Sequence, residues 1–217
     1  MKSLIYSVIV LVSVFCLKSY PPSQALFTSS DNITHTLVSF IDQERKTIRI
    51  ACATITSKPI QEALLHAKAR GVDIEIIVDK EWVDNNPSAS KCIAALERAG
   101  IPVFKFSSTH HRAFPAIMHH KFSCFYHTSQ YNCALVCTGS FNYTHQANIN
   151  CENILINYEP HIATQYLTEF EKLKQRITEQ TKHTPAPKIK REHPSLKEIK
   201  NTNRLMRQRL KKEYLLF

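Results

Sequence analysis

The sequence predicts an α/β fold, in which a mixed, largely parallel sheet is flanked by helices within a single domain. Between residues 32 and 106, apolar runs of strand length alternate with amphipathic runs of helix length. This alternation is typical of βαβ units and of the parallel sheets that they build. The chain has 217 residues, of which 43% are hydrophobic and 21% charged. That length and composition suffice for one domain with a sizeable core.

Start and stop signals separate the expected elements. Ser57 is a candidate cap for a helix with Pro59 in its first turn. That helix precedes Gly71 and a second helix precedes Gly100, and glycines favour the left-handed conformation that ends helices. We expect helices over residues 32–44, 58–70, 89–99 and 160–177. We expect strands over residues 47–53, 72–78, 101–106, 121–126, 134–138 and 152–157.

The first 25 residues have the composition of a targeting segment. Lys2 precedes a mostly apolar run over residues 4–17, and a proline pair and a small-x-small signal ending at Ala25 follow. A run of fourteen residues is shorter than the roughly 20 that span a bilayer. A cleaved secretory signal peptide is therefore favoured over an uncleaved N-terminal anchor. Cleavage after Ala25 would leave a folded domain over residues 26–181 in an exported, periplasmic or secreted, protein.

The formal net charge of +10 is concentrated in the C-terminal tail, residues 182–217. Residues 182–213 hold eleven Lys and Arg against three Glu, whereas fifteen positive and fifteen negative side chains cancel over residues 26–181. Apolar residues recur near helical period after Ser195, so a basic amphipathic helix is one expectation and a solvated, disordered tail is the other. Such a helix would suit an anionic membrane surface, a nucleic acid or an acidic partner.

The cysteines give no signal for a metal site. Six follow the expected cleavage site, and they form neither a C-x-x-C pair nor a spaced Cys/His set. In an exported protein Cys124 could pair with Cys133 or Cys137 across a hairpin, and buried free thiols are the alternative. We expect no metal and no other cofactor.

A histidine and a lysine stand two residues apart at the start of a predicted strand. They are His119 and Lys121 in the segment M-H-H-K-F, which G-S-F-N at residues 139–142 and then Glu152 follow. Residues two apart on a strand project to the same face, whereas His120 between them projects to the opposite face. A neutral imidazole can attack phosphorus, and lysine and asparagine side chains can donate hydrogen bonds to phosphate oxygens. These residues therefore predict metal-free phosphodiester chemistry.

The same segments resemble the signature of the phospholipase D superfamily, which is H-x-K-x4-D followed by G-S-x-N. The resemblance covers residues 28–178 and is greatest to the single-motif branch, which includes bacterial secreted endonucleases and the mitochondrial cardiolipin hydrolase type. It implies a phospholipase D-like catalytic domain over residues 26–181 and roles for five residues. These are His119 as nucleophile, Lys121 and Asn142 as phosphate ligands, Ser140 as an assisting and substrate-binding hydroxyl, and Glu152 as the group that orients His119.

One position departs from the family signature. The signature aspartate would be the fifth residue after Lys121, where this chain has Tyr126, and no aspartate follows Asp84. That aspartate mainly supports the structure rather than the reaction, so we expect the phosphodiesterase activity to persist. A weakened, non-catalytic binding module is the alternative.

The resemblance to single-motif members also implies a homodimer, because a second histidine must protonate the leaving group. It leaves the substrate open between a phospholipid, hydrolysed to phosphatidic acid, and a DNA or RNA phosphodiester. The zero net charge of residues 26–181 counts against a nuclease, since phosphate contacts dominate nucleic-acid affinity. The basic tail suits adsorption to anionic lipid, so phospholipid hydrolysis is favoured.

Other residues near the motif are weaker candidates. Loop residues upstream and residues after the G-S-F-N segment belong to this group. They are His110, His111, Arg112, His145 and Gln146. Trp82 is expected to be a packing residue rather than a platform on which a substrate stacks.

Overall fold

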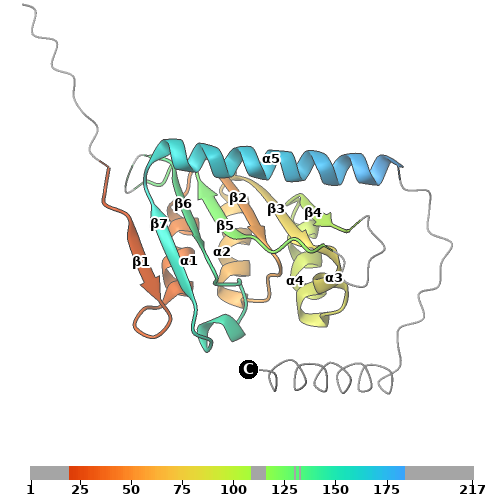
Figure 1. Ribbon diagram of the computed structural model, residues 1–217, viewed down its shortest axis with the longest axis horizontal. Coiled ribbons are helices and arrows are strands. Elements are labelled where there is room, and N and C mark those ends of the chain that lie inside the picture. Colours follow the sequence, from red (N-terminus) through yellow and green to blue (C-terminus); the bar gives the residue numbers. More distant parts are fainter. Residues whose placement is uncertain (1–19, 109–115, 130, 132, 184–217) are drawn as a thin grey trace, which may run out of the picture. The chain divides into compact units, whose positions relative to one another are not determined.

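The computed structural model describes residues 20–108, 116–129, 131 and 133–183. Its centre is a seven-stranded sheet with the order β1-β7-β6-β5-β2-β3-β4, which Figure 1 shows with α5 lying across one face. The strands are β1 (Gln24–Phe27), β2 (Thr47–Cys52), β3 (Asp73–Asp79), β4 (Val103–Phe106), β5 (Lys121–Phe125), β6 (Leu135–Gly139) and β7 (Asn153–Asn157). The helices are α1 (Ile33–Gln43), α2 (Lys58–Ala69), α3 (Lys80–Asp84), α4 (Pro87–Arg98) and α5 (Pro160–His183), with a 3-10 turn at Gln146–Asn148.

The strand pairing is mixed, which confirms the predicted α/β class and corrects the extent of its parallel part. Strands β2, β3 and β4 pair in parallel. The pairs β1–β7, β7–β6, β6–β5 and β5–β2 are antiparallel. Parallel neighbours need a long crossover, which α2 and α4 provide, whereas β5, β6 and β7 follow one another through connections without an α-helix. The predicted parallel arrangement therefore holds only where helices alternate with strands.

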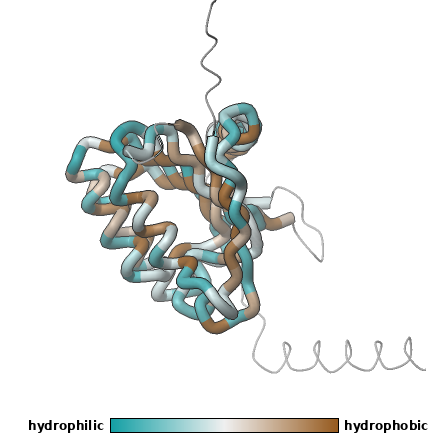
Figure 2. The backbone as a smooth tube through the Cα atoms, turned by 90° about the vertical axis from the view of Figure 1, so that its left-hand side faces the viewer, coloured by the Kyte–Doolittle hydropathy of each residue, from teal (hydrophilic) through white to brown (hydrophobic). Residues whose placement is uncertain are grey.

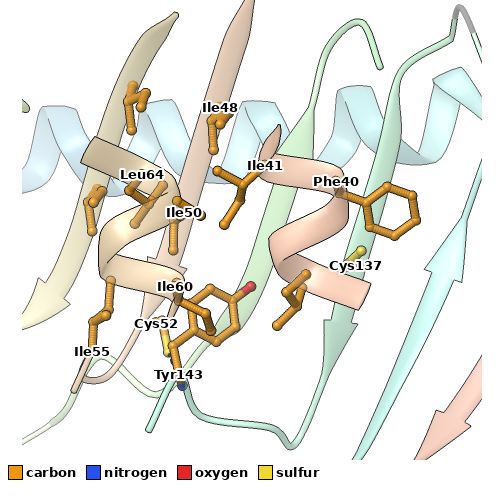
Figure 3. Close-up of a cluster of buried hydrophobic side chains, with 14 of the residues drawn as sticks. Phe40, Ile41, Ile48, Ile50, Cys52, Ile55, Ile60, Leu64, Cys137 and Tyr143 are labelled. Atoms are coloured by element: carbon orange, nitrogen blue, oxygen red, sulfur yellow. Dashed lines mark hydrogen bonds between the residues drawn. The ribbon is translucent and has the colours of Figure 1, made fainter. Parts of the chain in front are cut away.

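Apolar layers cover both faces of the sheet. On one face, side chains of α1, α2 and α4 pack on the strands, and Figure 3 shows Ile41 and Leu64 beside Ile48 and Ile50 of β2. On the other face, α5 contributes Phe170 to a second buried cluster. The tube in Figure 2 shows apolar residues along the central strands and polar residues on the outer turns of the helices. Each fully buried aliphatic or aromatic side chain contributes about 1.5–3 kcal/mol.

Helix ends follow the sequence signals with one exception. Gly71 and Gly100 have φ angles of 86° and 78°, as expected for residues that end a helix in the left-handed region. Asn86 caps α4 through its side chain. Ser57 precedes α2, but its side chain makes no capping hydrogen bond. Its backbone N–H instead donates to the carbonyl of Tyr143, 2.9 Å away, and so contacts the motif region.

Two elements, β1 and α3, do not appear among the sequence expectations. They are four and five residues long, too short for a periodic apolar pattern to develop. β1 pairs with β7, Ala25 opposite Leu155. The expected cleavage point after Ala25 therefore lies within a paired strand.

Several sequence features lie outside the described residues. They include the apolar run at residues 4–17, the tail after residue 183, and His110, His111 and Arg112. The chain divides into two units, residues 1–182 and 183–217. In the described ranges, every helix is too short or too polar to cross a membrane.

Candidate active site

Strand ends bring the motif residues to one edge of the sheet. β2 ends at Cys52, β3 at Asp79 and β6 at Gly139, whereas β5 begins there at Lys121 and β7 at Asn153. The register of β2 and β5 places Cys52 directly opposite Lys121. Antiparallel pairing thus lets residues that are far apart in the sequence share this edge.

Lys121 is a buried cation at the centre of this edge. Its Nζ donates to the carbonyl of His119 over 2.8 Å. Desolvation by burial lowers the pKa of Lys121, and the nearby Cys52 and Glu152 act in the opposite direction. The ammonium is therefore held in place before any substrate arrives, with a carboxylate close enough to affect it electrostatically.

His119 lies two residues before the start of β5, and it is exposed. The ring contacts Trp82 edge-on, with 6.1 Å between ring centroids and 73° between ring planes. The backbone N–H of the preceding Met118 donates to Asp79 Oδ2 over 2.9 Å. The indole and two backbone hydrogen bonds thus fix His119 and the residue before it.

Glu152 contacts other groups than the one expected. Its Oε1 accepts a hydrogen bond of 3.2 Å from the Asn150 side chain, and its backbone N–H donates to Thr28 Oγ1 over 2.9 Å. Over the described residues, no hydrogen bond or ion pair joins Glu152 to His119. The structure brings Glu152 near Lys121 but leaves its expected contact with His119 unmade.

The G-S-F-N segment is fixed against β7 by a close backbone approach. A Cβ atom on Gly139 would lie 2.2 Å from the carbonyl oxygen of Asn153. The next residue, Ser140, donates from its backbone N–H to that carbonyl and accepts from the Asn153 N–H at its Oγ, both over 3.1 Å. Glycine is required here because the two strands leave no space for a side chain.

Tyr143, the residue after the motif asparagine, anchors the loop that carries Asn142. Its backbone carbonyl accepts hydrogen bonds from the N–H groups of Thr56 (2.8 Å) and Ser57 (2.9 Å). Its buried hydroxyl contacts the Ser123 hydroxyl of β5. The loop that carries Asn142 is therefore attached both to the segment between β2 and α2 and to β5.

Cys52 links this loop to the buried lysine. The Tyr143 N–H donates to Cys52 Sγ over 3.4 Å, a contact that Figure 3 shows with the two residues side by side. Asn142 Oδ1 lies 3.9 Å from the same sulfur. Burial raises the pKa of Cys52 to about 11, so at neutral pH the residue is a thiol. Lys121 and Asn142 are thus held on either side of one buried neutral group.

His120 faces away from this cluster, as strand alternation predicts. Its Nε2 lies 3.7 Å from Glu169 Oε1 of α5, and its ring contacts Phe122. His145 and Gln146 are exposed on the 3-10 turn, where the Gln146 side chain donates to Asn150. These three residues lie apart from the contacts that hold Lys121 and Asn142.

Trp82 and Asp79 are site residues that the sequence analysis missed. The sequence predicts Trp82 to be a packing residue rather than a stacking platform, and in the structure it is 41% exposed and packs edge-on against His119. Its place beside His119 had no sequence signal because α3, which carries it, is too short to predict. Asp79 carried a usable signal, since a carboxylate ending a buried parallel strand lies at the edge where sites form.

At the end of β5, where the signature aspartate is replaced by Tyr126, the carboxylate of Glu44 binds the backbone. Tyr126 is 53% exposed, whereas Glu44, between α1 and β2, is fully buried. Glu44 Oε1 accepts from the backbone N–H groups of Lys46 (2.7 Å) and Thr47 (3.1 Å), and Oε2 accepts from His127 over 2.8 Å. The turn beyond β5 is therefore attached to β2 by a glutamate from another segment.

The cysteines of the described region are free thiols, five of them buried and Cys151 exposed. The pairing of Cys124 with Cys133 or Cys137 is thus absent, and burial raises the pKa of Cys124 to about 12. Across the described ranges, His, Cys, Asp and Glu side chains form no cluster of three or more that could hold a metal ion.

The chain resembles proteins of known family over most of this domain. A family model described as "Cardiolipin synthase, PLD-like domain" matches residues 37–174. Mitochondrial cardiolipin hydrolase of Xenopus tropicalis is 30% identical over 145 residues, which make up 66% of this chain and 62% of that protein. The match thus spans less than two thirds of the hydrolase.

Two solved structures share the fold. The phospholipase D family member Nuc from Salmonella typhimurium has a TM-score of 0.60 and 26% identity, with 71% of this chain and 94% of that chain covered. NucT from Helicobacter pylori has a TM-score of 0.60 at 20% identity, with 71% and 97% covered, a similarity of fold alone. With one copy of the motif and a family match over residues 37–174, the chain belongs to the single-motif branch of the phospholipase D superfamily.

Proposed function

We propose that this protein is a metal-independent phosphodiesterase that acts through a phosphohistidine intermediate, with a phospholipid as substrate and phosphatidic acid as product. The observation that carries the proposal is the cluster at the sheet edge. There a buried Lys121 is fixed to the backbone of His119, and Asn142 is fixed through the same thiol that faces Lys121. A cation and an amide held beside an exposed imidazole suit the binding of a phosphate group.

In the proposed reaction, a neutral His119 imidazole attacks phosphorus and the alcohol group leaves with a proton from a second histidine. Water then attacks the phosphohistidine, releases the phosphate monoester and returns a proton to that second histidine. Lys121, Asn142 and Ser140 donate hydrogen bonds to the non-bridging oxygens. We assign Glu152 to orient His119 in the substrate complex, since catalytic hydrogen bonds often form only there.

The second histidine comes from a second copy of the chain. Each chain holds one H-x-K segment that a G-S-x-N segment follows, so a homodimer with the two His119 side chains facing each other would complete the proposed site. One His119 is then neutral and the other protonated in the resting enzyme, a coupled pair with a bell-shaped pH profile.

Apolar side chains beside His119 support the choice of a phospholipid. Ile117 and Trp82 are among the exposed large hydrophobic residues, and Trp82 contacts the His119 ring. The charges of residues 26–181 cancel, which gives little general attraction for a polyanion. Cleavage of DNA or RNA is the second candidate, because the basic tail at residues 182–213 would also suit a phosphate backbone.

For the N-terminal segment we propose an uncleaved anchor or a signal peptide of an exported protein. The pairing of β1 favours the anchor, because cleavage after Ala25 would remove Gln24 and Ala25 from their partners on β7. The basic tail is proposed to adsorb to anionic membrane surfaces, at ~1 kcal/mol per basic residue near the surface.

The test uses the purified full-length chain with a chelator present. Phosphatidylcholine or cardiolipin vesicles form one arm, single-stranded DNA a second, and a soluble phosphodiester a third. We expect head-group release that His119→Ala abolishes and His120→Ala, whose side chain faces α5, retains. DNA cleavage without lipid turnover would replace the phospholipid by a nucleic acid. Absence of turnover in all three arms would leave the binding-module alternative.

A further inference from the structure

We propose that Asp79 is a positioning residue for His119 and that it acts through both Met118 and Trp82. This inference rests on the proposed role of His119 as nucleophile. It concerns how a sheet-end carboxylate sets the direction of an exposed imidazole that lacks a contact with Glu152.

Asp79 is a buried carboxylate, 3% exposed, whose two oxygens have different partners. Oδ1 accepts a hydrogen bond from the backbone N–H of Trp82 over 3.1 Å and thereby caps α3. Oδ2 accepts the Met118 N–H over 2.9 Å. One rigid group therefore fixes the backbone next to the nucleophile and the helix that carries the aromatic neighbour of the nucleophile.

Asp79 is itself fixed to the sheet edge. It is the last residue of β3, and its own N–H donates to the carbonyl of Ala53 over 3.1 Å. Ala53 directly follows Cys52, which faces Lys121 across the β2–β5 pair. The position of Asp79 is thus tied to the strand ends that hold the lysine, so the histidine and the lysine share one frame of reference.

The ring of His119 has its aromatic contact with Trp82. The backbone on either side is held by Asp79 at Met118 and by Lys121 at the His119 carbonyl. With the backbone fixed, the remaining freedom is rotation of the imidazole, which the edge-on contact with Trp82 restricts. In-line attack depends on this direction, and a misplacement of about 1 Å can cost 10²-fold in rate.

The variants Asp79→Asn and Trp82→Ala test the inference in different ways. Asparagine offers one acceptor oxygen where Asp79 uses two, so either the α3 cap or the Met118 bond is lost. Trp82→Ala keeps the backbone N–H and removes the exposed ring. We expect each to lower kcat on a soluble phosphodiester by about tenfold to 100-fold with little change in KM. Trp82→Phe should restore most of the loss, because an aromatic edge contact remains.

Asp73→Asn is the matched control. Asp73 lies at the other end of β3, where its exposed carboxylate pairs with the largely buried Arg49. The variant removes a carboxylate from the same strand without touching Met118 or α3. We expect its kcat to equal that of the unmodified chain, and an equal loss in Asp73→Asn and Asp79→Asn would overturn the positioning role.

An NMR measurement tests the inference without turnover. The imidazole carbon-bound protons of His119 should experience the ring current of Trp82, so Trp82→Ala should shift their resonances. Asp79→Asn should shift the same resonances toward the Trp82→Ala values, while Asp73→Asn leaves them unchanged. Unchanged His119 resonances in Asp79→Asn would overturn the inference. If the unmodified chain shows no phosphodiester turnover but the shifts occur, the proposed function fails and the positioning contact stands.

Discussion

The burial of Lys121 has a cost in stability that its proposed function explains. Charged groups lose hydration when they are buried, and this loss lowers the pKa of Lys121 from its ordinary value of 10.5. The folded protein therefore binds the Lys121 proton less tightly than the unfolded chain does. A group that destabilises the fold and lies beside the proposed nucleophile is typical of a functional site.

Lys121→Met separates the two effects. Methionine keeps a similar length without the charge, so we expect the free energy of unfolding to rise by about 1 kcal/mol, at the low end of the range for such replacements. Turnover of a soluble phosphodiester should disappear. Urea unfolding and the kinetic assay measure these two outcomes, and a less stable Lys121→Met would contradict the first.

The pH dependence of the free energy of unfolding, compared between Lys121→Met and the unmodified chain, gives a further test. The pKa of Lys121 is lower in the folded protein than in the unfolded chain, so the unfolded chain binds more protons between that lowered value and 10.5. The free energy of unfolding therefore rises with pH across that window, as the destabilisation caused by the buried charge disappears. The stability difference between Lys121→Met and the unmodified chain should therefore be greatest at neutral pH and should narrow toward pH 10.5.

Residues that carry a motif could be found from the sequence, whereas most residues that act through a fold contact had no signal, Asp79 at the end of a buried strand being the exception. His119, Lys121, Ser140 and Asn142 stand in recognisable segments, and the structure brings these segments to one sheet edge. The role of Cys52 had no signal, because buried cysteines are common in ordinary cores.

At the scale of elements, Glu44 explains how the sheet tolerates Tyr126. Its carboxylate joins the end of α1 and the start of β2 to the turn after β5. The substitution Glu44→Gln keeps the size of the side chain but would place an NH2 group against backbone N–H donors. We expect this variant to lower the free energy of unfolding by about 1–3 kcal/mol, the cost of leaving a buried donor unpaired. Urea unfolding measures the loss.

Asp42→Asn controls for the change of a carboxylate in the same segment. Asp42 is exposed, and its carboxylate makes an ion pair with Arg70 over 3.9 Å, so we expect a change within about 0.5 kcal/mol. A loss as great as that of Glu44→Gln would show that the backbone hydrogen bonds of Glu44 are not the cause.

Elements with full periodic patterns were predictable, whereas β1 and α3, of four and five residues, were not. The helices at 33–43, 58–69 and 87–98 and the strands between them follow from apolar periodicity and glycine stops. β1 has only four residues and gains its identity from pairing with β7. The antiparallel pairing of β5, β6 and β7 could not be predicted either, because the alternation of side chains along a strand is the same in parallel and antiparallel pairs.

At the scale of the whole molecule, the proposed site is incomplete in one chain. In the proposed mechanism His119 is the nucleophile and Lys121 and Asn142 are phosphate ligands, but a single chain contains one copy of the motif in which G-S-x-N follows H-x-K. In that mechanism the proton donor for the leaving group comes from another copy of the chain. This requirement makes activity depend on the composition of the dimer rather than on the amount of functional chain alone.

Mixed dimers test this dependence. Unmodified and His119→Ala chains are unfolded together in urea and refolded, so that the chains combine at random. If each site needs two His119 residues, activity follows the square of the unmodified fraction, and an equal mixture retains about a quarter of the activity of the same total amount of unmodified chain. Independent sites would retain about half. His120→Ala serves as the matched partner, because its side chain faces α5, and an equal mixture with it should keep full activity. Retention of half the activity in the His119→Ala mixture, with sedimentation showing a monomer, would contradict the shared site.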